Sequence, residues 1–165
     1  MSKFLGPDTC LAVTASDPDT ADGLAVRLTP GTTWVSHILQ RLTLALVTDE
    51  AVRAGIEHAA VHYAERNTAF ARALQERGLP TTPGDGLNLW VPLPVPATRV
   101  REELMHRGWL VREGDPFFLG EGDHGAFLRL TVHDLDEASA RTLADDIARA
   151  CRVLRADTGS GRIEA

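Results

Sequence analysis

The chain has 165 residues, of which 44% are hydrophobic and 24% charged, and its formal net charge at pH 7 is −6. This length fits one domain or parts of two, and the composition is ordinary for a soluble globular protein. The negative charge argues against direct binding of a nucleic-acid backbone, and no apolar run approaches the ~18 residues that a membrane span requires.

The first fifty residues contain one expected strand and one expected helix. Residues 9–15, TCLAVTA, form a short apolar run between turn residues, which is typical of a buried strand. Residues 34–47, WVSHILQRLTLALV, carry apolar side chains almost all round, which predicts a helix buried on most sides. This helix should therefore lie inside a larger body.

A long amphipathic helix is expected from Asp49 to Arg77. Thr48 or Asp49 is its natural N-cap, and Gly78 and Pro80 end it. About 29 residues at 1.5 Å each give a length of ~43 Å, more than one compact domain of this size needs, so the helix is expected to connect two bodies. Its apolar stripe consists of Val52, Ile56, Ala59, Tyr63, Phe70 and Leu74.

The segment after residue 80 has the order of a small α/β sandwich. Residues 87–93, LNLWVPL, alternate like a strand and end at prolines, as an edge strand does. The remaining elements are an amphipathic helix (97–108), a short strand (109–113), a glycine-rich loop (114–125), an alternating strand (126–134) and a closing helix (136–155). The polar tail, residues 156–165, is expected to be disordered.

Three patterns resemble ligand motifs but have simpler interpretations. GEGDHG at 120–125 matches G-x-G-x-x-G, yet a strand rather than a helix follows it, so we interpret it as a loop. His58 and His62 are four residues apart on the long helix, but no third metal ligand is placed nearby, and solvated helix surface is favoured. Cys10 and Cys151 have no metal-ligand spacing, and both are expected to be reduced core residues.

Arg129 is a candidate carboxylate ligand. If its neighbours Leu128 and Leu130 face the core, alternation places its guanidinium on the opposite face of the strand. A strand arginine of this kind suits bidentate recognition of a carboxylate. An ordinary solvent-facing arginine is the alternative, and spacing alone favours it.

Five motifs follow one another in register over nearly the whole chain. They are SKFLGPDTCLA (2–12), WVSHILQRL (34–42), HYAERNTAFARALQERGL (62–79), GLNLWVPLP (86–94) and FLRLTV (127–132). In this order they resemble class I/II, fold-type I aminotransferases that depend on pyridoxal 5'-phosphate. The last motifs look most like the aminotransferase-type domain of MocR-type regulators, which fuse a GntR-family DNA-binding domain to a pyridoxal-phosphate fold. The resemblance therefore implies amino-group transfer, or amino-acid and cofactor sensing in transcription regulation.

The resemblance also implies roles for three residues. Lys3 matches the lysine that forms a Schiff base with pyridoxal phosphate, since a primary amine condenses reversibly with an aldehyde and then shuttles a proton. Ser2 precedes it as in the family's cofactor-binding pattern, and Arg129 matches the arginine that holds the substrate carboxylate. An amino acid or keto acid is the implied small-molecule partner.

By the same resemblance, the α/β chain divides into three parts. Residues 1–48 would be a remnant of the cofactor-binding large domain, 49–79 the connecting helix, and 80–165 the small C-terminal α/β sandwich. No secretory signal is visible, so we expect a cytoplasmic protein, with no membrane partner and no direct nucleic-acid contact by this segment. A homo-oligomer or a partner chain is expected to cover the apolar 34–47 helix.

Two departures from the family pattern predict that the isolated chain is inactive. Cys10 stands where the family has an arginine for the cofactor phosphate, and a thiol cannot replace a guanidinium beside a dianion. The family's segments before the lysine, with the aspartate that pairs the pyridinium nitrogen, do not occur in this sequence, and the cofactor needs that partner to act as an electron sink. A truncated product or a non-enzymatic interaction module derived from this fold are the alternatives.

Overall fold

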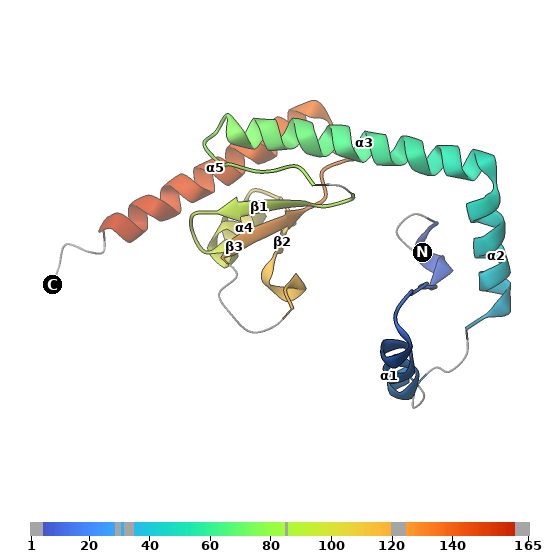
Figure 1. The fold of residues 1–165 in the computed structure, drawn as a ribbon. Helices are drawn as coiled ribbons and strands as arrows, with labels where there is room; N and C mark the ends of the chain where they lie inside the picture. Colours follow the sequence, from blue (N-terminus) through green and yellow to red (C-terminus); the bar gives the residue numbers. More distant parts are fainter. Residues whose placement is uncertain (1–4, 29–30, 32–34, 85, 120–124, 161–165) are drawn as a thin grey trace. The chain divides into compact units, whose positions relative to one another are not determined.

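A computed structural model describes residues 5–28, 31, 35–84, 86–119 and 125–160 (Figure 1). The chain divides into two units, Met1–Ala59 and Ala60–Ala165. The boundary falls inside the long helix α3 (Glu50–Gln75), which Figure 1 shows as one continuous rod. Within the described ranges, no helix combines the length and the apolarity that crossing a bilayer requires.

The first unit is helical in its described part. After the 3-10 turn η1 (Pro7–Thr9) it contains α1 (Pro18–Leu28), α2 (His37–Thr48) and the beginning of α3. Each helix begins at a side-chain cap, a pattern that satisfies backbone N–H groups left unpaired in the first turn. The capping side chains, each accepting from a backbone N–H three residues on, are Asp17 for α1, Ser36 for α2 and Asp49 for α3.

One prediction for this unit is wrong and a second is found. The described residues 10–16 form no strand, and Val13 is 75% exposed. A strand needs a neighbour to pair its backbone groups, and the described part of this unit contains no other strand. The predicted helix at 34–47 is found as α2. Among the described residues of this unit no sheet covers it, and Ile38 is 78% and Leu44 62% exposed, which agrees with the apolar surface expected for a partner to cover.

The second unit is a three-stranded antiparallel sheet with helices. The strands are β1 (Leu89–Leu93), β2 (Arg112–Glu113) and β3 (Ala126–Leu130), in the order β1-β3-β2. α4 (Ala97–His106), the 3-10 turn η2 (Asp115–Phe117) and α5 (Glu137–Ser160) complete the unit together with the second half of α3. The predicted α/β fold class is confirmed.

The alternation of β3 places its leucines in the core. Leu128 is fully buried and Leu130 nearly so, together with Leu89 and Val91 from β1. They pack against buried side chains of α3, α4 and α5, which include Leu74, Leu104 and Ile147. Complete burial of one such side chain is worth about 1.5–3 kcal/mol. This packing fixes which face of β3 Arg129 occupies.

The predicted end of the long helix is confirmed. Gly78 has a φ of 79°, which a residue with a side chain rarely adopts. Its N–H donates to the carbonyl of Gln75, and the N–H of Leu79 donates to the carbonyl of Leu74. These two bonds form the Schellman motif, which reverses the chain toward β1.

Candidate functional site

Arg129 lies on the sheet face opposite the core. In the strand register it stands opposite Trp90 of β1 and Arg112 of β2, and directly opposed residues share one face of a sheet. Its guanidinium carbon lies 4.3 Å from the ring centroid of Phe117, which η2 brings over this face. A cation stacked on an aromatic ring at this distance is held electrostatically by the ring.

An aromatic cluster borders this arginine. The Trp90 ring lies 5.3 Å from Phe118, 6.1 Å from Phe127 and 6.3 Å from Phe117, measured between ring centroids. Phe118 and Phe127 are 5.7 Å apart. These separations and tilts are those that aromatic pairs prefer. The cluster therefore gives Arg129 a packed, apolar border on one side.

Gly114 attaches η2 to this face of the sheet. Its N–H donates to the carbonyl oxygen of Phe127 at 2.8 Å. A Cβ added here would lie 2.7 Å from Cζ3 of Trp90 and 2.9 Å from Cβ of Phe127, closer than real Cβ contacts. Only glycine therefore lets the segment that carries Phe117 approach the sheet this closely.

The guanidinium of Arg129 has no acidic partner among the residues that the structure describes. Among the described residues, neither Arg129 nor Arg112 forms an ion pair or a side-chain hydrogen bond. Like charges directly opposite each other on neighbouring strands repel, so this face has a local positive potential. A guanidinium held this way can bind a carboxylate through two parallel N–H donors.

No family model matches the chain. Over 150 residues it is 43% identical to the vitamin B6 salvage pathway transcriptional repressor PtsJ of Salmonella typhimurium, an alignment that includes 91% of this chain and 34% of PtsJ. The chain thus spans about a third of this curated relative.

Two solved aminotransferases have a similar fold. LysN of Thermus thermophilus, an α-aminoadipate aminotransferase complexed with N-(5'-phosphopyridoxyl)-L-leucine, matches 94% of this chain with 41% of its own, at a TM-score of 0.73 and 23% identity. The kynurenine aminotransferase of Pyrococcus horikoshii matches 92% of this chain with 39% of its own, at a TM-score of 0.75 and 20% identity. The chain has the fold of the C-terminal part of a fold-type I aminotransferase. The predicted resemblance to these enzymes and to MocR-type regulators is confirmed.

In this aminotransferase-like chain, the predicted cofactor residues Lys3 and Ser2 lie outside the described residues, so their roles stay predictions. Of the GEGDHG loop only Gly125 is described.

Cys10 is exposed and has a left-handed backbone conformation, with a φ of 38°. Its predicted burial is wrong, because it follows the η1 turn rather than beginning a strand. Cys151 is buried, as predicted.

The two histidines of α3 differ from each other. His58 is exposed, as predicted for a solvated face. His62 is half-buried, with Nε2 3.3 Å from the carbonyl oxygen of His133, and the neighbouring Tyr63 ring lies 4.6 Å from the His133 ring. The surface interpretation is therefore wrong for His62, because the segment after β3 packs there. Among the residues that the structure describes, no three His, Cys, Asp or Glu side chains form a metal-binding group.

The aromatic partners of Arg129 were not predicted from the sequence. Phe117 belongs to the GDPFF stretch, which we interpreted as loop, and Trp90 is opposite Arg129 only because of the β1-β3 register. The alternation of LNLWVPL was the available signal, since it places Trp90 on the face away from Leu89 and Val91.

Proposed function

We propose that this chain is the C-terminal, ligand-recognising part of a cytoplasmic MocR-type regulator, in which Arg129 binds the carboxylate of an amino acid or keto acid. The observation that carries the proposal is the guanidinium of Arg129, which is stacked on Phe117 and forms no ion pair with a described residue. The identity of 43% between this chain and a transcriptional repressor of the vitamin B6 salvage pathway supports a regulatory role. Amino-group transfer is the activity of the enzymes with a similar fold.

In this proposal each residue of the face has one task. Arg129 donates two parallel hydrogen bonds to the carboxylate, each worth about 1.5–3 kcal/mol when the acceptor is charged. Phe117 fixes the plane of the guanidinium before the ligand arrives, which lowers the entropy cost of binding. Trp90 and its neighbours exclude water from one side, and Arg112 adds positive potential.

The described stretch 5–28, which includes Cys10, does not fit pyridoxal phosphate by itself. A phosphate dianion requires charged or backbone donors, and the described stretch 5–28 contains a single basic side chain, Arg27. The position expected to hold a phosphate arginine carries the exposed thiol of Cys10. We propose that this chain alone is inactive, and that cofactor binding requires residues supplied from outside it.

A pyridoxal phosphate titration of the 165-residue chain tests the cofactor part of the proposal. We expect borohydride reduction followed by mass spectrometry to leave Lys3 unmodified at equimolar cofactor. Lys3→Ala controls for non-specific labelling of the α-amino group. Stoichiometric labelling of Lys3 that is absent in Lys3→Ala would show that this chain forms a working cofactor site and would refute the proposal.

Binding of pyruvate, followed by NMR chemical shifts of the sheet amides, tests the carboxylate part. We expect Arg129→Gln to weaken binding about tenfold or more, the equivalent of one charge-assisted bond. Arg152→Gln, an exposed arginine on α5, is the matched control for the loss of one positive charge. If both substitutions weaken pyruvate binding equally, the effect comes from the general loss of positive charge, and a specific role of Arg129 is contradicted.

A second candidate function is a non-enzymatic interaction module, and the apolar surface of α2 favours it. Ile38 and Leu44 are 78% and 62% exposed, a surface that monomers rarely leave open over several residues. Size-exclusion chromatography with light scattering should then show a dimer or larger species that Ile38→Ser with Leu44→Ser converts to monomer. A monomeric wild-type chain would contradict this candidate.

A further inference from the structure

A cavity of about 470 Å³ lies in the second unit, lined by the second half of α3, the segment after β3 and the start of α5. Arg129 does not line this cavity, so the cavity is separate from the sheet face that carries Arg129, which we call the Arg129 face. Its volume falls within the range of small-molecule sites, which are usually apolar with a few placed polar groups. The apolar lining consists of Ala69, Phe70, Ala73, Val132, Leu135 and Ala140.

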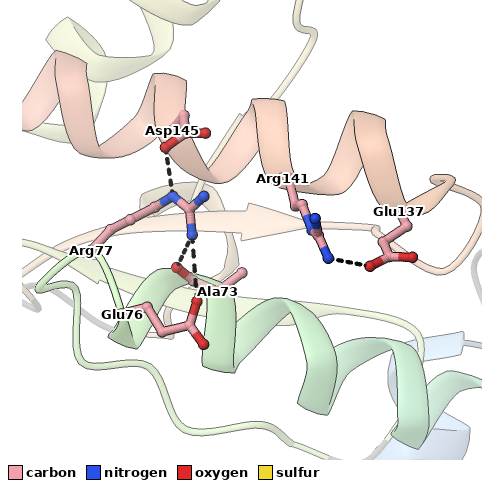
Figure 2. A network of polar contacts seen from close by, with 6 residues as sticks. All are labelled: Ala73, Glu76, Arg77, Glu137, Arg141 and Asp145. Atoms are coloured by element: carbon pink, nitrogen blue, oxygen red, sulfur yellow. Dashed lines mark hydrogen bonds and ion pairs between the residues drawn. The ribbon is translucent and has the colours of Figure 1, made fainter.

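Two arginines of the rim are already paired, as Figure 2 shows. Nε of Arg77 lies 2.7 Å from Asp145 of α5, and its Nη1 donates to the carbonyl oxygen of Ala73 at 2.7 Å. Arg141 pairs with Glu137 one turn earlier on α5. The Arg77–Asp145 contact links the turn that follows α3 to α5, so the cavity walls are held together before any ligand binds.

Two further arginines line the same cavity without partners. Arg66 and Arg72 are exposed, and among the described residues neither forms an ion pair or a side-chain hydrogen bond. The only acidic lining residues are Glu76 and Glu137, which lie beside Arg77 and Arg141. Four arginines and two glutamates therefore line this mixed polar and apolar cavity, and the lining has an excess of positive charge.

We propose that this cavity binds a small organic anion with an apolar body, such as an aryl or alkyl carboxylate or phosphate monoester. The apolar body contacts the alanines and Phe70, and the anionic group accepts hydrogen bonds from Arg66 and Arg72. An inorganic ion lacks the apolar body and therefore gains no binding energy from the apolar lining residues. A neutral aromatic molecule leaves both guanidinium groups without their acceptor.

NMR titration of the 165-residue chain tests the site, with phenyl phosphate and phenylacetate as the two probes. We expect saturating shifts at the backbone amides of Ala69, Ala73 and Ala140. Inorganic phosphate and benzyl alcohol should bind at least about tenfold more weakly than phenyl phosphate, since each lacks one half of the recognition. Comparison of the two aromatic probes shows whether a phosphate ester or a carboxylate is the better ligand.

Variants distinguish binding in this cavity from general electrostatic attraction and from binding at the Arg129 face. The double substitution Arg66→Gln with Arg72→Gln should weaken phenyl phosphate binding by about tenfold or more. Arg53→Gln is the matched control, because Arg53 is an exposed arginine of the same helix outside the cavity. Arg129→Gln should also leave the affinity for phenyl phosphate unchanged. The proposal for this cavity and the proposed function of Arg129 can therefore be refuted independently of each other.

A gain of affinity gives an independent readout. Glu137→Gln removes an exposed negative charge from the rim and releases Arg141, so phenyl phosphate should bind about twofold to fivefold more tightly. Shifts that map elsewhere, equal binding of inorganic phosphate and phenyl phosphate, or an affinity that the double arginine variant does not change would each overturn the proposal.

Discussion

Replacing Gly114 with alanine is the sharpest perturbation of the Arg129 face. Gly114 has φ −78° and ψ −30°, a conformation open to every residue, so the backbone alone does not require glycine here. In such a place alanine stabilises a protein by about 0.4–1 kcal/mol, because it reduces the conformational entropy of the unfolded chain. Considered alone, this effect predicts a more stable variant.

The packing of Gly114 predicts the opposite result. The added Cβ would lie 2.7 Å from the Trp90 ring and 2.9 Å from Cβ of Phe127. The Trp90 ring can rotate, but Cβ of Phe127 is fixed to the central strand, and the Gly114 N–H is bonded to the carbonyl of that same residue. Relief therefore requires a backbone shift, and overpacking of this kind costs about 1–3 kcal/mol. The packing cost exceeds the entropic gain.

We expect Gly114→Ala to lower the free energy of unfolding by about 1–2 kcal/mol. In urea denaturation followed by far-ultraviolet circular dichroism, this loss lowers the midpoint by roughly 0.5–1 M. Gly55→Ala is the matched control, since Gly55 is an exposed position of α3 with nothing within 4 Å of an added Cβ, and there we expect stabilisation of up to about 1 kcal/mol. If both variants are equally stabilised, the argument from the 2.7 and 2.9 Å contacts is refuted.

Two further predictions concern ionisable groups of α5. The hydrogen bond from Arg77 holds the pKa of Asp145 below its usual 3.8, so this pair stabilises the fold above that pH and the contribution is lost as the pH falls through the lowered value. The difference in unfolding free energy between wild type and Asp145→Asn should therefore be present at about pH 6 and vanish toward about pH 2. Burial raises the pKa of the Cys151 thiol above its usual 9.0, which keeps it protonated and unreactive at neutral pH. A thiol reagent at about pH 8 should modify exposed Cys10 quickly and Cys151 only after unfolding, and equal rates for both thiols would contradict the buried placement.

Local patterns predicted the elements whose signals lie within one segment. The stripe of α3 and its glycine stop at Gly78 follow from helix period and capping chemistry, which nearby residues determine. The face of Arg129 follows from the alternation of Leu128 and Leu130, because both leucines are buried. These features required no knowledge of distant partners.

Contacts between distant segments could not be predicted in the same way. Phe117 is twelve residues before Arg129 and reaches it only because the Gly114 N–H is bonded to Phe127. His62 meets a carbonyl 71 residues away. The predicted strand at 9–15 is not found for the same reason. Its apolar run has the propensity of a strand, but a strand forms only where a second strand supplies hydrogen bonds.

The buried residues are distributed unequally between the two units. Every buried hydrophobic residue that the structure describes belongs to the second unit, whereas the buried residues described in the first unit are Thr9 and Thr43. The Arg129 face rests on Leu128 and Leu130, which are part of that core. Because apolar burial is the main source of folding free energy, the second unit contains what it needs to hold Arg129 and Phe117 in place. The first unit has no comparable core among its described residues, so under the proposed function a cofactor site built on them depends on contacts from outside this chain, whereas the Arg129 face does not.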